Sequence, residues 1–179
     1  MPRRLLVAAL SLTVVLGIAV LVVTHTAARA GYLRDHPADP LTDDQASAQV
    51  VDAVVDVVKT TGLRDAAGGY AFHSCKNADD PPYQVTVNMT FTLPQGNSVA
   101  YLNGVATAMS GLGWTDAGSP SEHFGRKLTR AGLTAVFHRN PERSDLATMQ
   151  VSGECRVMTD HHADDPVWTE LTSRLRQVS

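Results

Sequence analysis

The chain has 179 residues, enough for one domain with a hydrophobic core and too few for two domains of ordinary size. Its 15 basic and 18 acidic residues give a formal net charge of -3, and the N-terminal basic block is only the pair Arg3-Arg4. A protein that binds phosphate backbones usually carries a basic patch or stripe, so we expect no nucleic-acid partner.

An apolar segment stands close to the N-terminus. Leu5–Val23 contains 19 residues, of which 16 are apolar and none is charged. As an α-helix rising about 1.5 Å per residue it would be about 28 Å long, close to the thickness of a bilayer's hydrocarbon core. Arg3 and Arg4 precede it, and the positive-inside rule keeps that end in the cytoplasm. Residues 1–30 therefore predict a signal-anchor that crosses the cytoplasmic membrane once, with the rest of the chain outside.

A cleaved secretory signal is the alternative for this segment. Signal peptides have apolar regions of about 7–15 residues, shorter than Leu5–Val23. The small residues Ala28 and Ala30 nevertheless form a cleavage pattern, and cutting near Ala30 would release a secreted protein. The length favours the retained anchor. Lipid attachment directly after the apolar segment is excluded, since the first cysteine is Cys75.

The part of the chain after residue 30 is acidic. It keeps 12 basic and 18 acidic residues, a formal charge of -6. This charge disfavours anionic lipid headgroups and polyanions as binding partners. The expected partners are the membrane, through Leu5–Val23, and a component or protein of the envelope.

Residues 31–41 hold two prolines and no periodic pattern, and they predict a spacer before a domain at 42–179. Thr42 and Gln45 have the spacing of a capping box, valines form a wide apolar stripe after them, and Gly62 provides a stop. A helix is expected between Thr42 and Gly62. Tertiary packing must stabilise it, because valine is a weak helix former.

Strict alternation of apolar and polar residues from Tyr83 to Leu93 predicts an antiparallel strand with one face on a core and the other in water. Shorter strands are expected at residues 70–75 and 147–155. Lys127–Arg139 predicts a strand or a tight hairpin.

A second helix is expected after residue 97, with apolar residues at helical spacing up to Met109. A last helix is expected with Asp165 as its cap, Pro166 in its first turn, and an apolar seam of Trp168, Leu171, Leu175 and Val178. The order αββαββα predicts an α+β domain in which helices cover a four-stranded antiparallel sheet.

The chain has two cysteines, Cys75 and Cys155, both close to the ends of expected strands. In an oxidising compartment such a pair normally forms a disulfide. A redox or metal pair is the alternative, and the absence of a C-x-x-C spacing argues against it.

Imidazoles and carboxylates alternate shortly before the last expected helix. Together they are ligand types that suit zinc, copper or nickel, and a solvated loop is the alternative interpretation. The residues of this candidate metal site are Asp160, His161, His162 and Asp164.

Two further candidates come from isolated residues. His73, His138 and Glu154 would form an acid-base or metal group if they met on one face of the sheet, and single histidines on a wet face are the alternative. Tyr83 and Trp114 are candidates for an aromatic binding patch, or else lie at the edge of the core. No hydrolase, dinucleotide, phosphate-loop or zinc-protease motif is present, so no cofactor is expected.

The segment Phe72-His73-Ser74-Cys75, the run Pro81-Pro82-Tyr83 and Cys155 resemble a family of small cell-envelope proteins of mycobacteria and related actinobacteria, many described as lipoproteins or membrane proteins of unknown function. The resemblance covers about residues 42–175 and implies no catalytic residues.

Three functions are compatible with these features of the sequence. The favoured one is a membrane-tethered, non-enzymatic binding or accessory protein of the bacterial envelope. The second is a metal-dependent or acid-base enzyme that uses the region of His73, His138 and His161. The third is a carrier of a lipid or another small ligand between helices and sheet.

Overall fold

The computed structural model describes residues 39–76, 80–118, 125–164 and 168–179. The expected membrane segment at residues 1–30, and residues 31–38 of the expected spacer, lie outside these ranges. Among the described residues, no helix combines the length and the apolar character that a membrane crossing requires.

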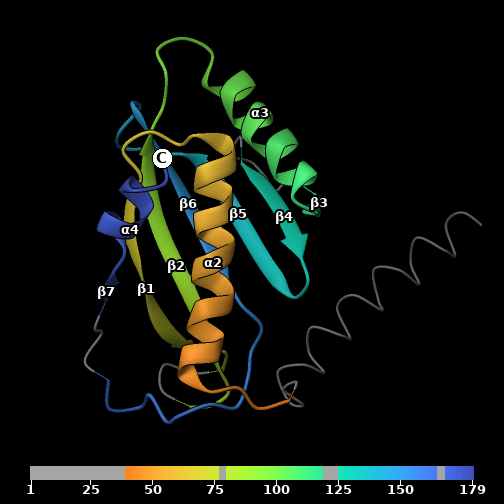
Figure 1. Cartoon of the computed structure of the whole chain (residues 1–179), viewed down its shortest axis with the longest axis vertical. Helices are drawn as coiled ribbons and strands as arrows, with labels where there is room; N and C mark the ends of the chain where they lie inside the picture. The colour runs from red at the N-terminus through yellow and green to blue at the C-terminus, as the bar shows by residue number, and fades with distance from the viewer. Residues whose placement is uncertain (1–38, 77–79, 119–124, 165–167) are drawn as a thin grey trace, which may run out of the picture. The chain divides into compact units, whose positions relative to one another are not determined.

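Helix α2 spans Asp43–Thr61 (Figure 1). The Thr42 hydroxyl accepts a hydrogen bond from the Gln45 amide at 3.2 Å, and the Gln45 side chain accepts one from the Thr42 amide at 3.0 Å. Gly62 has a φ of 60°, and its amide donates to the carbonyl of Val58. The predicted capping box and the predicted stop are both confirmed.

We expect Thr42→Ala to lower the free energy of unfolding by about 1 kcal/mol, because the first turn of α2 loses its side-chain acceptor. Urea unfolding measures the change. Thr107→Ala is the matched control, because Thr107 is an exposed threonine inside a helix and caps nothing. Equal losses in the two variants would contradict a capping role for Thr42.

The strands form one antiparallel sheet of seven members in the order β3-β4-β5-β6-β2-β1-β7. They are β1 (Ala67–Ser74), β2 (Tyr83–Thr92), β3 (Thr115–Asp116), β4 (Arg126–Arg130), β5 (Leu133–Arg139), β6 (Leu146–Ser152) and β7 (Thr169–Glu170). The prediction of four strands was wrong. Of the two alternatives for residues 127–139, a strand or a tight hairpin, the structure has the hairpin β4–β5. The two-residue strands β3 and β7 occupy the edges and are too short to leave a periodic pattern.

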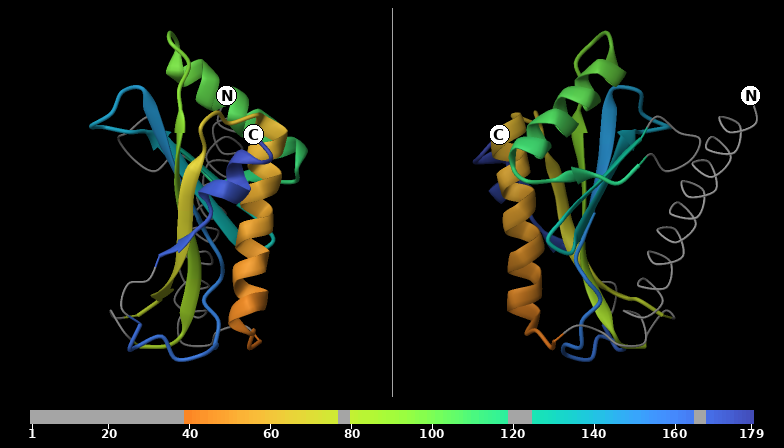
Figure 2. Two further views of the ribbon diagram at one scale, coloured as in Figure 1. Left: turned by 60° about the vertical axis from the view of Figure 1, so that its left-hand side comes forward. Right: turned by 90° about the vertical axis from the view of Figure 1, so that its right-hand side faces the viewer.

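Helix α3 (Ser98–Gly111) begins at Asn97, whose side chain accepts the Ala100 amide at 3.0 Å. Together with α2 and the short helix α4 (Thr172–Arg176) it lies on one side of the sheet (Figures 1 and 2). Within the described part of the chain, the other face of the sheet carries no helix.

The start of the last helix differs from the prediction. Asp165 and Pro166 lie outside the described residues, while Thr169–Glu170 is strand β7, which pairs with Tyr70 and Gly69 of β1. Helix α4 begins only at Thr172. Without a neighbour, the outer edge of β1 would expose unpaired backbone groups. Residues 169–170 pair with some of these groups as a strand, instead of extending α4 by a further turn at its N-terminus.

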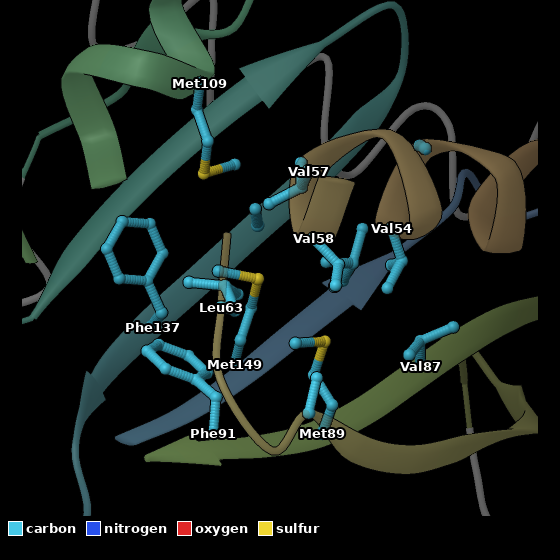
Figure 3. Packing of buried hydrophobic residues seen from close by; sticks show 14 of the residues in the cluster. Val54, Val57, Val58, Leu63, Val87, Met89, Phe91, Met109, Phe137 and Met149 are labelled. Atoms are coloured by element: carbon cyan, nitrogen blue, oxygen red, sulfur yellow. The ribbon is translucent and has the colours of Figure 1, made fainter. Parts of the chain in front are cut away.

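The core lies between α2, α3 and the covered face of the sheet. Every second residue of β2 from Tyr83 to Phe91 is buried there, as its alternation predicted. Phe137 of β5 is opposite Met149 of β6, and both are buried with Phe91 of β2 in the same core cluster (Figure 3). Valines of α2, including Val54, Val57 and Val58, close the core from the helix side.

Candidate functional site

The disulfide lies at one end of the sheet. Cys75 follows β1 and Cys155 follows β6, and the two sulfur atoms are bonded at 2.11 Å with their Cα atoms 6.1 Å apart. Strand β2 lies between these two strands in the sheet. The structure thus contains the predicted disulfide, which joins the ends of two strands that are not neighbours.

The chain after Cys155 runs past the N-terminal end of α2. Its first contact is a pair of backbone hydrogen bonds between Tyr83 and Arg156, at 2.8 and 3.0 Å. The Leu41 amide then donates to the Val157 carbonyl at 3.2 Å, and the Thr159 amide donates to a carboxylate oxygen of α2 at 3.2 Å. These hydrogen bonds attach residues 155–164 to the N-terminal end of α2, where the spacer enters the domain.

The buried imidazole of His161 is the centre of a cluster of side chains in this segment, and the carboxylate of Asp164 in that cluster is 53% exposed. The His161 side chain is 8% exposed, and its ring stacks on Phe72 with centroids 3.9 Å apart and 9° between the planes. Tyr83 meets the same ring edge-on at 5.1 Å. Nδ1 lies 2.7 Å from Asp164 Oδ2, and Nε2 lies 3.4 Å from Asp43 Oδ1, close enough for an ion pair but without hydrogen-bond geometry. We call these residues with Asp160 the His161 cluster.

Asp160 contributes an acceptor to the cluster. Its Oδ1 accepts hydrogen bonds from the Tyr83 hydroxyl at 2.9 Å and from the His162 amide at 3.0 Å. The bond from the His162 amide, and then the bond from Tyr83, hold the pKa of Asp160 below its ordinary value of 3.8. Burial, and then the bond to Asp160, raise the pKa of Tyr83 above its ordinary value of 10.0.

The predicted metal site gains no support from this arrangement. Asp160 is engaged by Tyr83 and Asp164 by His161, while His162 contributes its backbone amide to the same network. Among the described residues, no group of three histidine, cysteine, aspartate or glutamate side chains is placed to hold a metal ion. Through these contacts, the His161 cluster holds residues 155–164 against β1, β2 and α2.

Asp160 also gives the fold a pH dependence. Because its pKa is lowered by folding, its charge stabilises the folded state above the ordinary carboxyl pKa, and this contribution is lost as the pH falls below that value. Between about pH 5 and pH 3, we expect the free energy of unfolding to fall less steeply for Asp160→Asn than for the wild type. Urea unfolding across that range measures both slopes, and parallel slopes would contradict the assignment.

The structure does not bring His73, His138 and Glu154 together. His73 is on β1 opposite Gln84, whereas His138 is on β5, with β6 and β2 between the two strands. His138 is level with Thr90 of β2 through the intervening β6 pair, six residues from Gln84 or about 20 Å along the strand. The carboxylate of Glu154 pairs with the guanidinium of Arg156.

Tyr83 and Trp114 do not form an exposed aromatic patch, because both are buried in the core. The Arg130 guanidinium lies 5.0 Å from the Trp114 ring centroid, a cation–π distance. The Trp114 indole N–H is buried without a hydrogen-bond partner among the described residues. Both residues are buried because of their positions in the fold: Tyr83 begins β2 on its core side, and Trp114 lies between α3 and β3.

The face of the sheet without helices carries neutral polar side chains at its centre, in three rows across β2 and β6. The middle row is a pair of carboxamides, the row on either side of it is a pair of hydroxyl groups, and all six of these side chains are uncharged. These six residues, here called the open face because no described helix covers it, are the opposed pairs Thr86–Ser152, Asn88–Gln150 and Thr90–Thr148; Thr86 is buried at 2% exposure, and Gln150 is exposed.

Trp168 lies at the edge of the open face. Gly69 pairs with Asn88 on one side and with Glu170 on the other, so Glu170 points to the same face as Asn88. The indole N–H donates to the Glu170 carboxylate at 3.1 Å. The indole occupies the space next to Gly69, because a Cβ atom at that position would lie only 2.6 Å from the indole nitrogen. Trp168 is 43% exposed. Sequence reasoning missed this position because the apolar spacing assigned Trp168 to a helix seam.

A family model described as "Putative lipoprotein LppJ" matches residues 42–174. A protein of that description from Mycobacterium tuberculosis (strain CDC 1551 / Oshkosh) is 39% identical over 176 residues, covering 98% of this chain and 92% of the relative. One from Mycobacterium bovis is 43% identical over 144 residues, covering 80% of this chain and 75% of the relative. No solved structure matches.

The family match covers nearly all of the described domain and agrees with the envelope resemblance of the sequence. The lipoprotein description implies a membrane-associated location in the cell envelope. The chain belongs to the family described as "Putative lipoprotein LppJ", whose function is unknown.

Proposed function

We propose that this protein is a membrane-tethered accessory protein of the cell envelope, with a non-enzymatic binding domain outside the cytoplasm. The observation that carries the proposal is the disulfide between Cys75 and Cys155. Disulfides form and persist in oxidising compartments and are rare in the cytoplasm of mesophiles. The disulfide therefore supports export of the domain.

The same disulfide bears on how the domain is attached. The chain has two cysteines, and each is bonded to the other, which leaves neither thiol free to carry a lipid. This supports attachment through the apolar segment Leu5–Val23. The contacts of residues 155–164 with Asp39, Leu41 and Asp43 make the entry point of that tether part of the folded domain.

The described residues favour a binding role over the two alternatives. For an enzyme, the histidines at 73, 138 and 161 would have to converge, and they lie on β1, on β5 and in the His161 cluster. For a carrier, ligand would have to enter between helices and sheet, where the side chains of both layers form the core (Figure 3). The open face, by contrast, is free of helices in the described structure.

Protease treatment of intact spheroplasts tests the proposal, with an epitope tag after Ser179. We expect the tag to be digested from outside while an N-terminal fragment stays with the membrane. A variant that lacks Leu5–Val23 is expected to leave the domain in the cytoplasm and protect the tag. Protection of the wild-type tag until lysis would contradict the proposal.

A further inference from the structure

The open face and Trp168 together form a surface whose chemistry indicates a ligand. The Asn88–Gln150 pair continues the row that begins with Trp168 and Gly69 at the edge of the sheet. From Gly69 to Gln150 the row crosses from β1 to β6, a distance of about 10 Å. This is the length of a short oligomer of small rings rather than of one ring.

The polar groups of this row are available to a ligand. Within the described part of the chain, no hydrogen bond engages the side-chain amides of Asn88 and Gln150, whereas Thr86 and Ser152 bond to each other at 3.1 Å. Gln150 is exposed and Asn88 is half-buried. Each carboxamide offers two donors and an acceptor, which suits a ligand rich in hydroxyl groups.

The orientation of Trp168 is fixed before any ligand arrives. Glu170 accepts its indole N–H at 3.1 Å and also accepts the Thr172 amide at 2.9 Å. The carboxylate is thereby engaged within the protein. What remains exposed at this edge is the aromatic surface of Trp168, which is 43% exposed.

Charge decides between the ligand classes. The six open-face residues carry no charge, and the register continues the Asn88–Gln150 row through Val136 to one cation, Lys127 of β4. The chain after residue 30 has a formal charge of -6, so a highly charged anionic polymer is poorly matched by this surface. A protein interface of ordinary size has an apolar centre, whereas hydroxyls and carboxamides occupy the centre here. A neutral saccharide matches both features, because its ring faces are C–H surfaces and its edges are hydroxyl groups.

We propose that the open face and Trp168 bind a neutral glycan chain, one sugar ring on the indole and the following rings along Asn88 and Gln150. This inference rests on the proposed function and names the ligand class of its binding domain.

The test uses the full chain in lipid nanodiscs, which avoids detergents with sugar headgroups. The probes are neutral hexasaccharides of glucose, mannose and galactose, with oligogalacturonate as the anionic control, and binding is followed by ligand-observed NMR. We expect one neutral probe to bind with a Kd of about 1 mM, and oligogalacturonate to bind more weakly.

Trp168→Ala is expected to weaken that binding at least about tenfold, and Gln150→Ala to weaken it measurably. Gln150 is exposed, so its variant keeps the test decisive if Trp168→Ala misfolds. Val99→Ala is the matched control, because Val99 is 44% exposed but lies on α3, on the helix side of the sheet. It should bind like the wild type.

The inference is overturned if no neutral hexasaccharide binds the wild type at about 10 mM, or if the Trp168 and Gln150 variants bind unchanged. A negative result here, combined with digestion of the tag in spheroplasts, would reject the glycan and leave the tethered location standing. Protection of the tag combined with glycan binding would reject the location alone.

Discussion

Replacing Cys75 and Cys155 together by serine is expected to lower the free energy of unfolding by about 2–5 kcal/mol. The bond closes a loop with a sequence separation of 80, and the chain-entropy estimate for such a loop is about 4–5 kcal/mol. It also holds the start of residues 155–164 against the sheet. The loss of the bond should therefore loosen the His161 cluster as well.

Urea unfolding of the full chain measures the effect of the disulfide, and the reduced wild type is the control. Reduced wild type and the double variant should unfold at the same urea concentration, because both lack only the cross-link. A difference of less than about 1 kcal/mol between the oxidised wild type and the double variant would contradict a stabilising disulfide.

Phe91→Ala is expected to lower the free energy of unfolding by about 3–5 kcal/mol. Phe91 is fully buried on β2, in the middle of the sheet, and belongs to the same core cluster as Phe137 (Figure 3). Its removal takes apolar surface out of the core and leaves a cavity that the flanking strands cannot easily fill.

Two variants frame the result at Phe91. Phe91→Leu leaves a smaller cavity and should lose less than Phe91→Ala. Val99→Ala, on the exposed side of α3, should change the free energy of unfolding by less than about 0.5 kcal/mol. Equal losses for Phe91→Ala and Val99→Ala would contradict the packing described here.

Local patterns in the sequence predicted the elements whose signals are themselves local. The capping box at Thr42 and the left-handed Gly62 bound α2, and the alternation from Tyr83 gives β2 its buried face. The disulfide was predictable from the number of cysteines and the expected compartment. Each of these inferences depends on few residues and on chemistry that tertiary packing does not override.

The sequence does not decide between a strand and a hairpin at residues 127–139, because the turn between β4 and β5 lacks the residues typical of a hairpin. Ala131 and Gly132 have φ values of 45° and 83°, and positive φ is uncommon for alanine. Asparagine or aspartate before the glycine would have indicated a two-residue hairpin. The apolar spacing of Trp168 and Leu171 similarly predicted a helix, whereas pairing with the edge of β1 makes Thr169–Glu170 a strand.

The candidate site was the least predictable part of the molecule. His161 was a predicted metal ligand, but its neighbours Asp43, Phe72 and Tyr83 come from α2, β1 and β2, and no local pattern links them. Stacking and burial of the imidazole are products of the tertiary fold. The open face was partly visible in the polar positions of β2, but its pairing with β6 required the register of the sheet.

The central claim is that this domain is exported and closed by the Cys75–Cys155 disulfide. Trapping the thiols in living cells tests it most directly: cells are quenched with acid, and the full chain is alkylated with a permeant mass-tagged maleimide before and after reduction. We expect no tag before reduction and two tags after it. Two tags on the unreduced chain would show that both thiols are free in the cell and would contradict an exported, disulfide-closed domain.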